Sequence, residues 1–156
     1  MRALVQRVEE AKVSVNGEVR GAVGRGFMVL LGVTHGDTEQ DADWLAQKML
    51  SLRIFEDDAG KMNRSIRDIG GGILLISQFT LHADARHGNR PGFSAAARPE
   101  VAEPLYEYMK KRLFAELGEG RFGAGVFGAE MKIAMVADGP VTIPLDTAGL
   151  GNRKEI

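Results

Sequence analysis

Residues 72–81 read Gly-Ile-Leu-Leu-Ile-Ser-Gln-Phe-Thr-Leu, and the predicted fold is organised around these residues. Its first half is short, bulky and bounded by glycines, which predicts a strand buried in a sheet. Because side chains alternate along a strand, we expect Gln78 and Thr80 on one face and Ser77 and Phe79 on the other. Two polar side chains on one face, where an apolar strand ends, are a common arrangement in active sites.

A second stretch, Asp138-Gly139-Pro140-Val141-Thr142, interrupts another strand-like run. Residues 131–136 have the pattern of a strand, the Gly-Pro pair breaks it, and residues 141–143 resume it. Glycine and proline together most often form an ordinary turn. Here we expect the Gly-Pro stretch to meet the end of the 72–81 strand in space.

The rest of the chain alternates strand patterns with two helical patterns. Strands are expected at 3–8, 11–15, 18–23, 27–33 and 53–55, and helices at 39–51 and about 100–117. Each helix carries one apolar stripe, made of Ala42, Leu45, Met49 and Leu52 in the first and of Ala102, Leu105, Met109 and Leu113 in the second. Pro104 is awkward inside the second helix, so we expect that helix to start late.

These elements predict a single domain of mixed α/β class. We expect two twisted, largely antiparallel β-layers with both helices on one side, a three-layer arrangement. The chain of 156 residues is long enough to bury a proper core. The domain is expected to span residues 1–148, followed by a polar C-terminal tail at 149–156.

Composition narrows the classes of function. The net charge of −1 provides no general basic field for long nucleic acids, so we expect no DNA partner and only a small local footprint on any RNA. The absence of cysteine removes thiol nucleophiles and cysteine-based metal sites and suits a reducing compartment. The longest apolar run, residues 27–33, is too short to span a bilayer, and no signal-peptide pattern opens the chain. We therefore expect a cytoplasmic protein.

Thr80 is the candidate nucleophile or hydrogen-bond donor, although a lone threonine at the end of a strand is more often structural. A nucleophile needs an adjacent base, and only His82 lies near in sequence. A solvated loop histidine is the commoner reading of His82. The loop also contains Asp84 and His87, but nothing fixes a ligand geometry, so no metal site is expected. Asp57-Asp58 is interpreted as an exposed acidic turn.

The two stretches together resemble the D-aminoacyl-tRNA deacylase family, also known as D-tyrosyl-tRNA deacylases. That family carries a Ser-Gln-Phe-Thr segment, here residues 77–80, and a Gly-Pro-Val-Thr segment near the C-terminus, here residues 139–142. The resemblance begins at residue 6, passes through 60–63 and 90–94, and ends near residue 146. The chain departs from the family at Ala137, where an asparagine is usual, and loses any hydrogen bond that this asparagine makes to the turn.

The resemblance implies a chiral proofreading hydrolase. It would cleave the ester between a D-amino acid and the 3′ end of tRNA, without a cofactor, and reject the L-ester. The implied catalytic residues are Gln78, Phe79 and Thr80, and the implied substrate-binding residues are Ser77, Gly139, Pro140 and Arg7. Backbone N–H groups would stabilise the oxyanion, with Thr80 as a covalent nucleophile the weaker hypothesis.

The resemblance also implies a homodimer in which a cis Gly139-Pro140 enters the partner's active site. Its carbonyl groups would exclude an L side chain and let a D side chain pass. Glycine has no side chain, so glycyl-tRNA is an expected second substrate. Arg7 would brace the Gly-Pro loop, whereas an exposed salt-bridging arginine is the alternative.

Two other functions stay open on the sequence. One is a small esterase using Thr80 and His82, and the other is a non-catalytic RNA-binding module whose Gly-Pro turn has been loosened by Ala137. Two basic groups are candidates for RNA contact, namely Arg86, His87, Arg90 and Arg98 beside the proposed site, and Lys61, Arg64 and Arg67 elsewhere.

Overall fold

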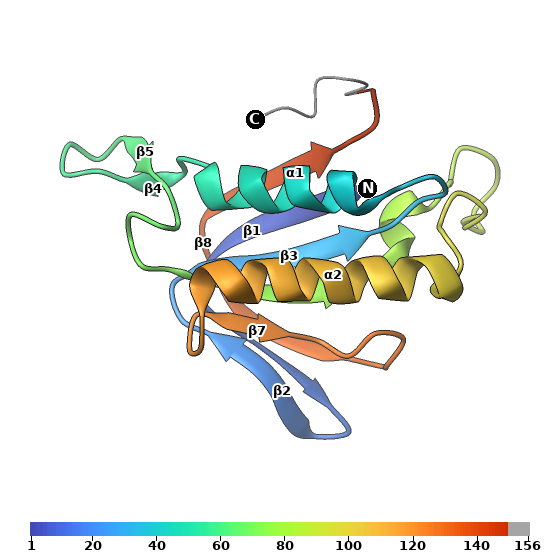
Figure 1. Cartoon of the computed structure of the whole chain (residues 1–156), viewed down its shortest axis with the longest axis horizontal. Helices are drawn as coiled ribbons and strands as arrows, with labels where there is room; N and C mark the ends of the chain where they lie inside the picture. The colour runs from blue at the N-terminus through green and yellow to red at the C-terminus, as the bar shows by residue number, and fades with distance from the viewer. Residues whose placement is uncertain (150–156) are drawn as a thin grey trace.

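The computed structural model describes residues 1–149 and shows a strongly curved sheet with two helices packed on one side (Figure 1). The strands are β1 (Arg2–Val15), β2 (Glu18–Val23), β3 (Gly26–Gly32), β4 (Phe55–Glu56), β5 (Met62–Arg64), β6 (Gly72–Ser77), β7 (Phe122–Ala124) and β8 (Lys132–Asp146). The helices are α1 (Glu39–Ser51), α2 (Pro99–Leu117) and the short 3-10 helix η1 (Phe79–His82). The predicted tail at 149–156 lies outside the described residues except for Gly149.

The main sheet has six strands in the order β2-β1-β3-β6-β7, with β8 on the other edge of β1. β1 is antiparallel to β2, β3 and β8, while β3-β6 and β6-β7 are parallel. We predicted separate strands at 3–8 and 11–15, which is wrong, because β1 continues through the exposed Glu9 and Glu10. The pairing of β1 with β8 shifts register near these residues, but β1 itself does not end there. Its first half pairs with β3 and its second half pairs with β2.

Two crossovers place both helices on the same side of the sheet. The parallel pair β3-β6 is joined through α1, and the parallel pair β6-β7 is joined through α2, as parallel strands require. Figure 1 shows α1 and α2 lying side by side over the strands. The predicted mixed α/β class, with two helices on one side, is confirmed.

The curved sheet separates two apolar cores. Ile73 and Leu75 of β6 point toward the helices, where the predicted helix stripes are buried except at Leu52, which follows the end of α1 and is half-buried. Leu74 and Ile76 point the other way, into a second cluster formed with β1, β2 and β3. The alternation predicted for residues 73–76 therefore decides which core each side chain joins.

Glycine lets the sheet curl until β2 lies against β7. A Cβ atom on Gly21 would lie 2.7 Å from the backbone nitrogen of Ala124, and one on Gly123 would lie 3.0 Å from that of Ala22. The first distance is shorter than Cβ atoms tolerate and the second is unusually tight, so the missing side chains of these glycines let the two backbones approach. The sheet is nearly a barrel as a result.

Two boundary predictions are wrong. We expected α2 to start late because of Pro104, but it begins at Pro99 and continues through Pro104, which is exposed. Pro99 suits the first helical position, because its fixed φ fits a helix and its missing N–H would have no partner there. The strand expected at 53–55 is β4, which begins only at Phe55. Among the described residues, the helices are all too short or too polar to cross a membrane.

Candidate active site

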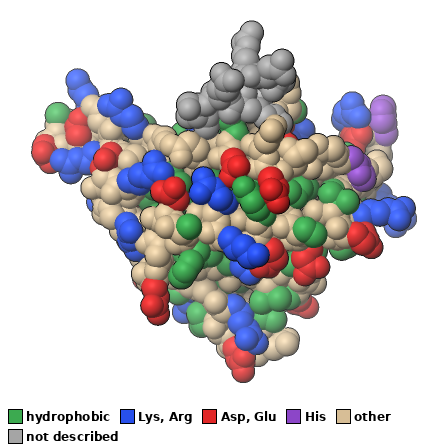
Figure 2. Space-filling model, in the orientation of Figure 1, with side chains coloured by type: hydrophobic (Ala, Val, Ile, Leu, Met, Phe, Trp, Pro, Cys, Tyr) green, Lys and Arg blue, Asp and Glu red, His purple; other side chains and the backbone are tan. Residues whose placement is uncertain are grey.

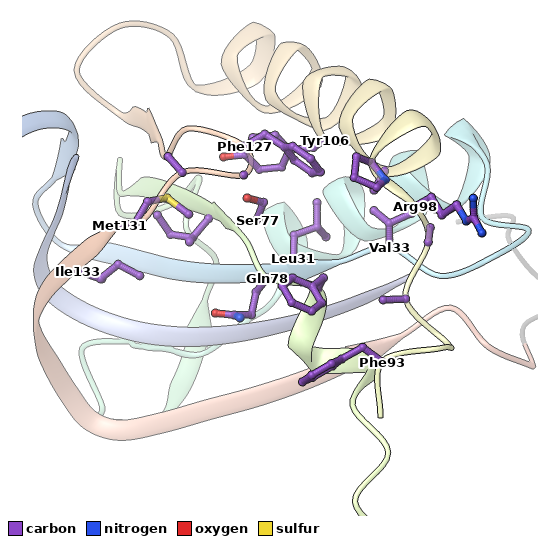
Figure 3. Close-up of a pocket in the computed structure, with 18 residues that line it drawn as sticks. Leu31, Val33, Ser77, Gln78, Phe93, Arg98, Tyr106, Phe127, Met131 and Ile133 are labelled. Carbon is purple, nitrogen blue, oxygen red and sulfur yellow. The ribbon is translucent and has the colours of Figure 1, made fainter. Parts of the chain in front are cut away.

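A pocket of about 610 Å³ lies beyond the carboxyl ends of β3 and β6, which is where ligands bind in many α/β folds (Figure 3). Strand ends, the start of α2 and the β7–β8 connection enclose it. The residues that line it are Leu31, Val33, Ile76, Ser77, Gln78, Phe79, Phe93, Ala96, Ala97, Arg98, Pro99, Ala102, Tyr106, Phe127, Gly128, Ala129, Met131 and Ile133. Most of these are apolar, so the pocket suits a ligand with a large apolar or aromatic part.

The Ser-Gln-Phe-Thr segment leaves the sheet earlier than we predicted. β6 ends at Ser77, the backbone N–H of Gln78 still donates to the carbonyl of Leu31 at 2.7 Å, and η1 follows. The prediction that Gln78 and Thr80 share a strand face is therefore wrong. Their side chains nevertheless meet, because the Gln78 amide donates to the Thr80 hydroxyl within this turn. Gln78 lines the pocket, whereas Thr80 is exposed beside it.

His82 is buried, so the prediction of a solvated loop histidine is wrong. Its ring packs against β3 at Gly32, where an added Cβ would lie 3.1 Å from the His82 Cδ2 atom. The Nε2 atom of His82 is buried without a hydrogen-bond partner among the described residues. Burial lowers the pKa of His82, an effect partly opposed by its hydrogen bond to the Gly32 backbone.

Other members of the predicted loop group do not converge with His82. The Asp84 carboxylate accepts hydrogen bonds from the guanidinium and backbone N–H of Arg86, which hold the pKa of that carboxyl down at about 2. No cluster of three histidine or acidic side chains within residues 1–149 is arranged to hold a metal ion. Asp57 likewise caps its own turn, accepting from the backbone N–H groups of Ala59 and Lys61.

Sequence reasoning missed the aromatic wall of the pocket. The buried Tyr106 hydroxyl lies 3.0 Å from the carbonyl oxygens of both Leu75 and Gly125 and shares its hydrogen bond between them. This contact connects α2 to the strand ends. Burial raises the pKa of Tyr106. Phe127 lies beside it, with ring centroids 5.9 Å apart. Tyr106 follows Leu105 on the predicted stripe of α2, but the helical pattern alone gives no sign that it reaches a pocket.

The Gly-Pro stretch is a loop that bulges from β8 while the strand continues on both sides. Gln6 pairs with Thr142 and Val8 pairs with Ala137, so residues 138–141 stand opposite the single residue Arg7. The Gly139-Pro140 peptide bond is cis, and Gly139 has φ of +117°. A Cβ at Gly139 would lie 2.8 Å from the Val141 Cγ2 atom, so glycine is the residue that fits.

Arg7 is buried beneath this loop. Its Nε atom lies 3.0 Å from the Asp138 carboxylate and 3.3 Å from the Asp138 carbonyl oxygen, and its Nη1 atom donates to the Ile54 carbonyl at 2.6 Å. The side chain is only 7% exposed. The alternative of an exposed salt-bridging arginine is therefore wrong. A second, polar pocket of about 380 Å³ lies here and is lined by Arg7, Glu9, Arg25, Glu56 and Asp138.

Within one chain, residues 77–79 line the apolar pocket, whereas Arg7 and Asp138, next to the Gly-Pro pair, line the polar pocket. Arg7 pairs with Phe27 near the start of β3, whereas Leu31 and Val33, near its end, line the apolar pocket. At about 3.3 Å per residue, four residues of strand separate the two sites by roughly 13 Å. Gly139 and Pro140 are both exposed at the far end. Ser77, Gln78 and Phe79 are thus brought together, and Gly139, Pro140 and Arg7 form a separate group.

Fold and pocket define a small single-domain α/β protein with an apolar site at the ends of parallel strands. The family of D-Tyr-tRNA(Tyr) deacylases matches residues 4–146, and the chain belongs to it. A D-aminoacyl-tRNA deacylase from Roseiflexus castenholzii is 58% identical over 95% of this chain and 93% of its own length. Another from Thermus aquaticus is 54% identical over 98% of this chain and all of its own length.

A solved structure supports the same fold. It is described as a c-Myc DNA unwinding element binding protein, with a TM-score of 0.88 and 41% identity, and it covers 94% of this chain and 99% of its own. The match to the family and the two deacylase relatives confirm the resemblance inferred from residues 77–80 and 139–142.

Proposed function

We propose that this protein is a chiral proofreading hydrolase that releases D-amino acids, and glycine, from the 3′ end of tRNA. Family membership over nearly the whole chain supports the substrate class. The observation on the molecule that carries the proposal is the exposed Gly139-Pro140 backbone, held from below by the buried Arg7. A fixed backbone loop without side-chain bulk is what steric exclusion of one enantiomer needs.

The chemistry is hydrolysis of an activated ester. Water adds to the ester carbonyl carbon, the bond to the ribose oxygen breaks, and that oxygen leaves with a proton. In our proposal the N–H groups of Phe79 and Thr80 stabilise the oxyanion, since the first N–H groups of a helix have no acceptor inside it. Gln78 and Thr80 orient ligand or water, with Ser77 as a further substrate contact.

Covalent catalysis by Thr80 has little support in the geometry. A nucleophilic hydroxyl needs a base within hydrogen-bond reach, and within residues 1–149 the side chain that contacts the Thr80 hydroxyl is the Gln78 amide, which donates to it. His82, which the esterase alternative requires, is buried against Gly32. We expect Thr80→Ala and Thr80→Val to retain turnover within about tenfold of the parent, as for a lost orienting contact. Complete loss of turnover in both variants would instead support Thr80 as a covalent nucleophile.

We propose a homodimer in which Gly139-Pro140 of one protomer enters the pocket of its partner. The pairing of Arg7 with Phe27 puts the loop near the start of β3, away from the pocket at its end, which supports insertion into a partner's pocket over its own. On β8, Ile133, Met135 and Val136 expose apolar side chains, and Ile133 also lines the pocket. A second copy seated on β8 would bury these side chains beside the pocket mouth.

In this arrangement, selectivity for the D-ester over the L-ester comes from a steric clash between the L side chain and the partner's loop. Carbonyl groups of the partner's loop would stand at the substrate α-carbon, where an L side chain meets backbone and a D side chain points away. Steric exclusion discriminates more strongly than a missing contact. Glycyl-tRNA should pass the same filter. Loosening of the loop by Ala137, which the RNA-binding alternative requires, finds no support because Arg7 contacts both the carboxylate and the carbonyl of Asp138.

The test is a deacylation assay that compares D-tyrosyl-, L-tyrosyl- and glycyl-tRNA under identical conditions. We expect hydrolysis of the D-ester and the glycyl ester, and hydrolysis of the L-ester slower by at least about a hundredfold. Rapid loss of the L-ester, or failure to hydrolyse any of the three, would contradict the proposal. We further propose a cytoplasmic location. Recognition is proposed to be confined to the 3′ end of tRNA, because a net charge of −1 provides no general basic field for the rest of the RNA.

A further inference from the structure

Two aromatic rings stand exposed at the mouth of the pocket. Phe79 is 56% exposed and Phe93 is 40% exposed, and both line the pocket. Their ring centroids are 5.2 Å apart with planes inclined at 72°, an edge-to-face pair. Exposed apolar surface next to a ligand pocket is a common mark of a binding surface.

Phe93 is held in place by its backbone. Gly92 exchanges two 2.8 Å backbone hydrogen bonds with Asp84, and the Phe93 carbonyl accepts from the Ala96 N–H at 3.0 Å. The next carbonyl, that of Ser94, lies 2.9 Å from the His35 ring nitrogen Nε2. The ring therefore belongs to an anchored segment, and binding against it costs little ordering entropy.

The pocket is too small for more than the end of the RNA. Its volume of about 610 Å³ is typical of a site that encloses one drug-sized ligand. On the proposed function, the terminal nucleoside and its amino acid fill that space. The preceding nucleotides must then leave across the mouth, where Phe79 and Phe93 stand.

A cation is available at the same mouth. Arg98 lines the pocket, is exposed, and forms no ion pair with any described residue. Figure 3 shows its guanidinium directed away from the pocket interior. Arg86, by contrast, is neutralised by Asp84. Over the helix-covered face in Figure 2, basic and acidic side chains alternate, so that face offers RNA no basic track.

We propose that Phe93, with Phe79, forms a stacking subsite for the nucleotide that precedes the terminal adenosine of tRNA, and that Arg98 contacts its phosphate. The proposal rests on the proposed function for the identity of the ligand. Stacking on aromatic side chains is how proteins bind unpaired bases without a duplex, and it adds about 1–3 kcal/mol per base. That increment corresponds to a roughly 5- to 150-fold gain in affinity.

The test measures binding, so it does not depend on catalysis. Calorimetry would compare the uncharged trinucleotide CCA with the same trinucleotide carrying abasic sites in place of both cytosines. Because the two trinucleotides carry the same phosphates and differ only in the cytosine bases, the ratio of their affinities measures stacking separately from charge. We expect a ratio of about 5 or more for the parent protein, a ratio within about twofold of unity for Phe93→Ala and Phe93→Leu, and a retained ratio for Phe93→Trp.

Phe114 supplies the matched control, because it is an exposed phenylalanine on α2 that does not line the pocket. Phe114→Ala should keep the parent ratio. Arg98→Gln should weaken both trinucleotides equally and lower the salt dependence of binding. A parent ratio near unity, an unchanged ratio in Phe93→Ala, or dissociation of a dimer by Phe93→Ala in sedimentation would overturn the subsite. If the parent protein shows the expected affinity ratio but does not hydrolyse D-tyrosyl-tRNA, the stacking subsite stands and only the proposed function is contradicted.

Discussion

Arg7 shows how one side chain can fix the shape of a loop. Four residues of β8 stand opposite it in place of one, and their backbone would otherwise lack support from β1. Its guanidinium contacts Asp138 and the carbonyl of Ile54 and is almost completely buried. A buried guanidinium is stable only when such partners surround it.

Replacing Arg7 by methionine should therefore be costly. The side chain keeps its apolar stem, but the Asp138 carboxylate and the Ile54 carbonyl lose their donor. We expect a loss of about 2–3 kcal/mol in the free energy of unfolding, measured by urea denaturation, because Asp138 retains some access to water. Arg20→Met is the control, since Arg20 and its partner Glu18 are both exposed, and it should change stability by less than about 0.5 kcal/mol.

His82 gives the molecule a defined pH dependence. Its pKa is lowered from the ordinary value of 6.5, chiefly by burial and also by the positive charge of Arg2. Below pH 6.5 the unfolded chain binds a proton that the folded protein resists. Stability is thus fully present above about pH 6.5 and is lost as the pH falls toward the lowered value.

The measurement is the free energy of unfolding between pH 7.5 and 5. We expect it to decrease with falling pH in the parent and to be flatter in His82→Leu, which removes the titrating group while filling the site. Acidic side chains with lowered pKa values, such as Asp84 and Glu130, change stability only at lower pH. An identical slope in parent and variant between pH 7.5 and 5 would show that His82 does not control this range.

At the scale of elements, periodicity predicted the helices well and the strand ends poorly. The apolar stripes of α1 and α2 are set by local spacing, so the sequence alone could place Leu45 and Met109 in the core. The turn after Ser77 depends on a hydrogen bond from Gln78 to Leu31 on another strand. The burial of His82 depends on the space left by Gly32. Neither contact has a local pattern that could predict it.

The pairing of β3 with β6 makes a sharper prediction. At Gly26 a Cβ would lie 1.9 Å from the carbonyl oxygen of Gly72, and its φ is +158°. Gly26→Ala must therefore separate the first residues of two central strands. We expect a loss of at least about 3 kcal/mol in thermal or urea unfolding, or failure to fold. Gly24→Ala, which meets open space and ordinary backbone geometry, should remain near the parent value.

At the scale of the whole molecule, the motifs that identify the family lie at opposite ends of β3. The sequence predicted that residues 77–80 and 139–142 meet, and no local pattern could tell whether they do so within a chain or between chains. In the single chain residues 77–79 line the apolar pocket, whereas Asp138, next to the Gly-Pro pair, lines the polar one. Between these regions β8 exposes the apolar side chains of Ile133, Met135 and Val136. A shared site would therefore be a property of two chains.

Mixed dimers test that arrangement directly. One variant, Ala129→Trp, fills the pocket, and the other, Gly139→Ala, distorts the loop, because its Cβ would lie 2.8 Å from the Val141 Cγ2 atom and 3.2 Å from the Arg7 Nη2 atom. Each homodimer should be inactive on D-tyrosyl-tRNA, because the first has no room for the substrate and the second lacks the undistorted Gly139-Pro140 backbone to which we assign substrate binding as well as selectivity. In a mixed dimer purified through two different tags, one pocket is intact and faces an intact loop from its partner. We expect about half of the parent activity, since one of two sites is complete.

The matched control places both substitutions on the same chain and pairs it with the parent chain. If the loop acts on its partner's pocket, the intact pocket then faces a distorted loop and the other pocket is filled, so this dimer should be inactive. If each loop served its own chain, the two results would exchange, with no activity in the first mixed dimer and half in the second. Because the two arrangements predict opposite outcomes from the same pair of substitutions, a change in stability alone cannot imitate either.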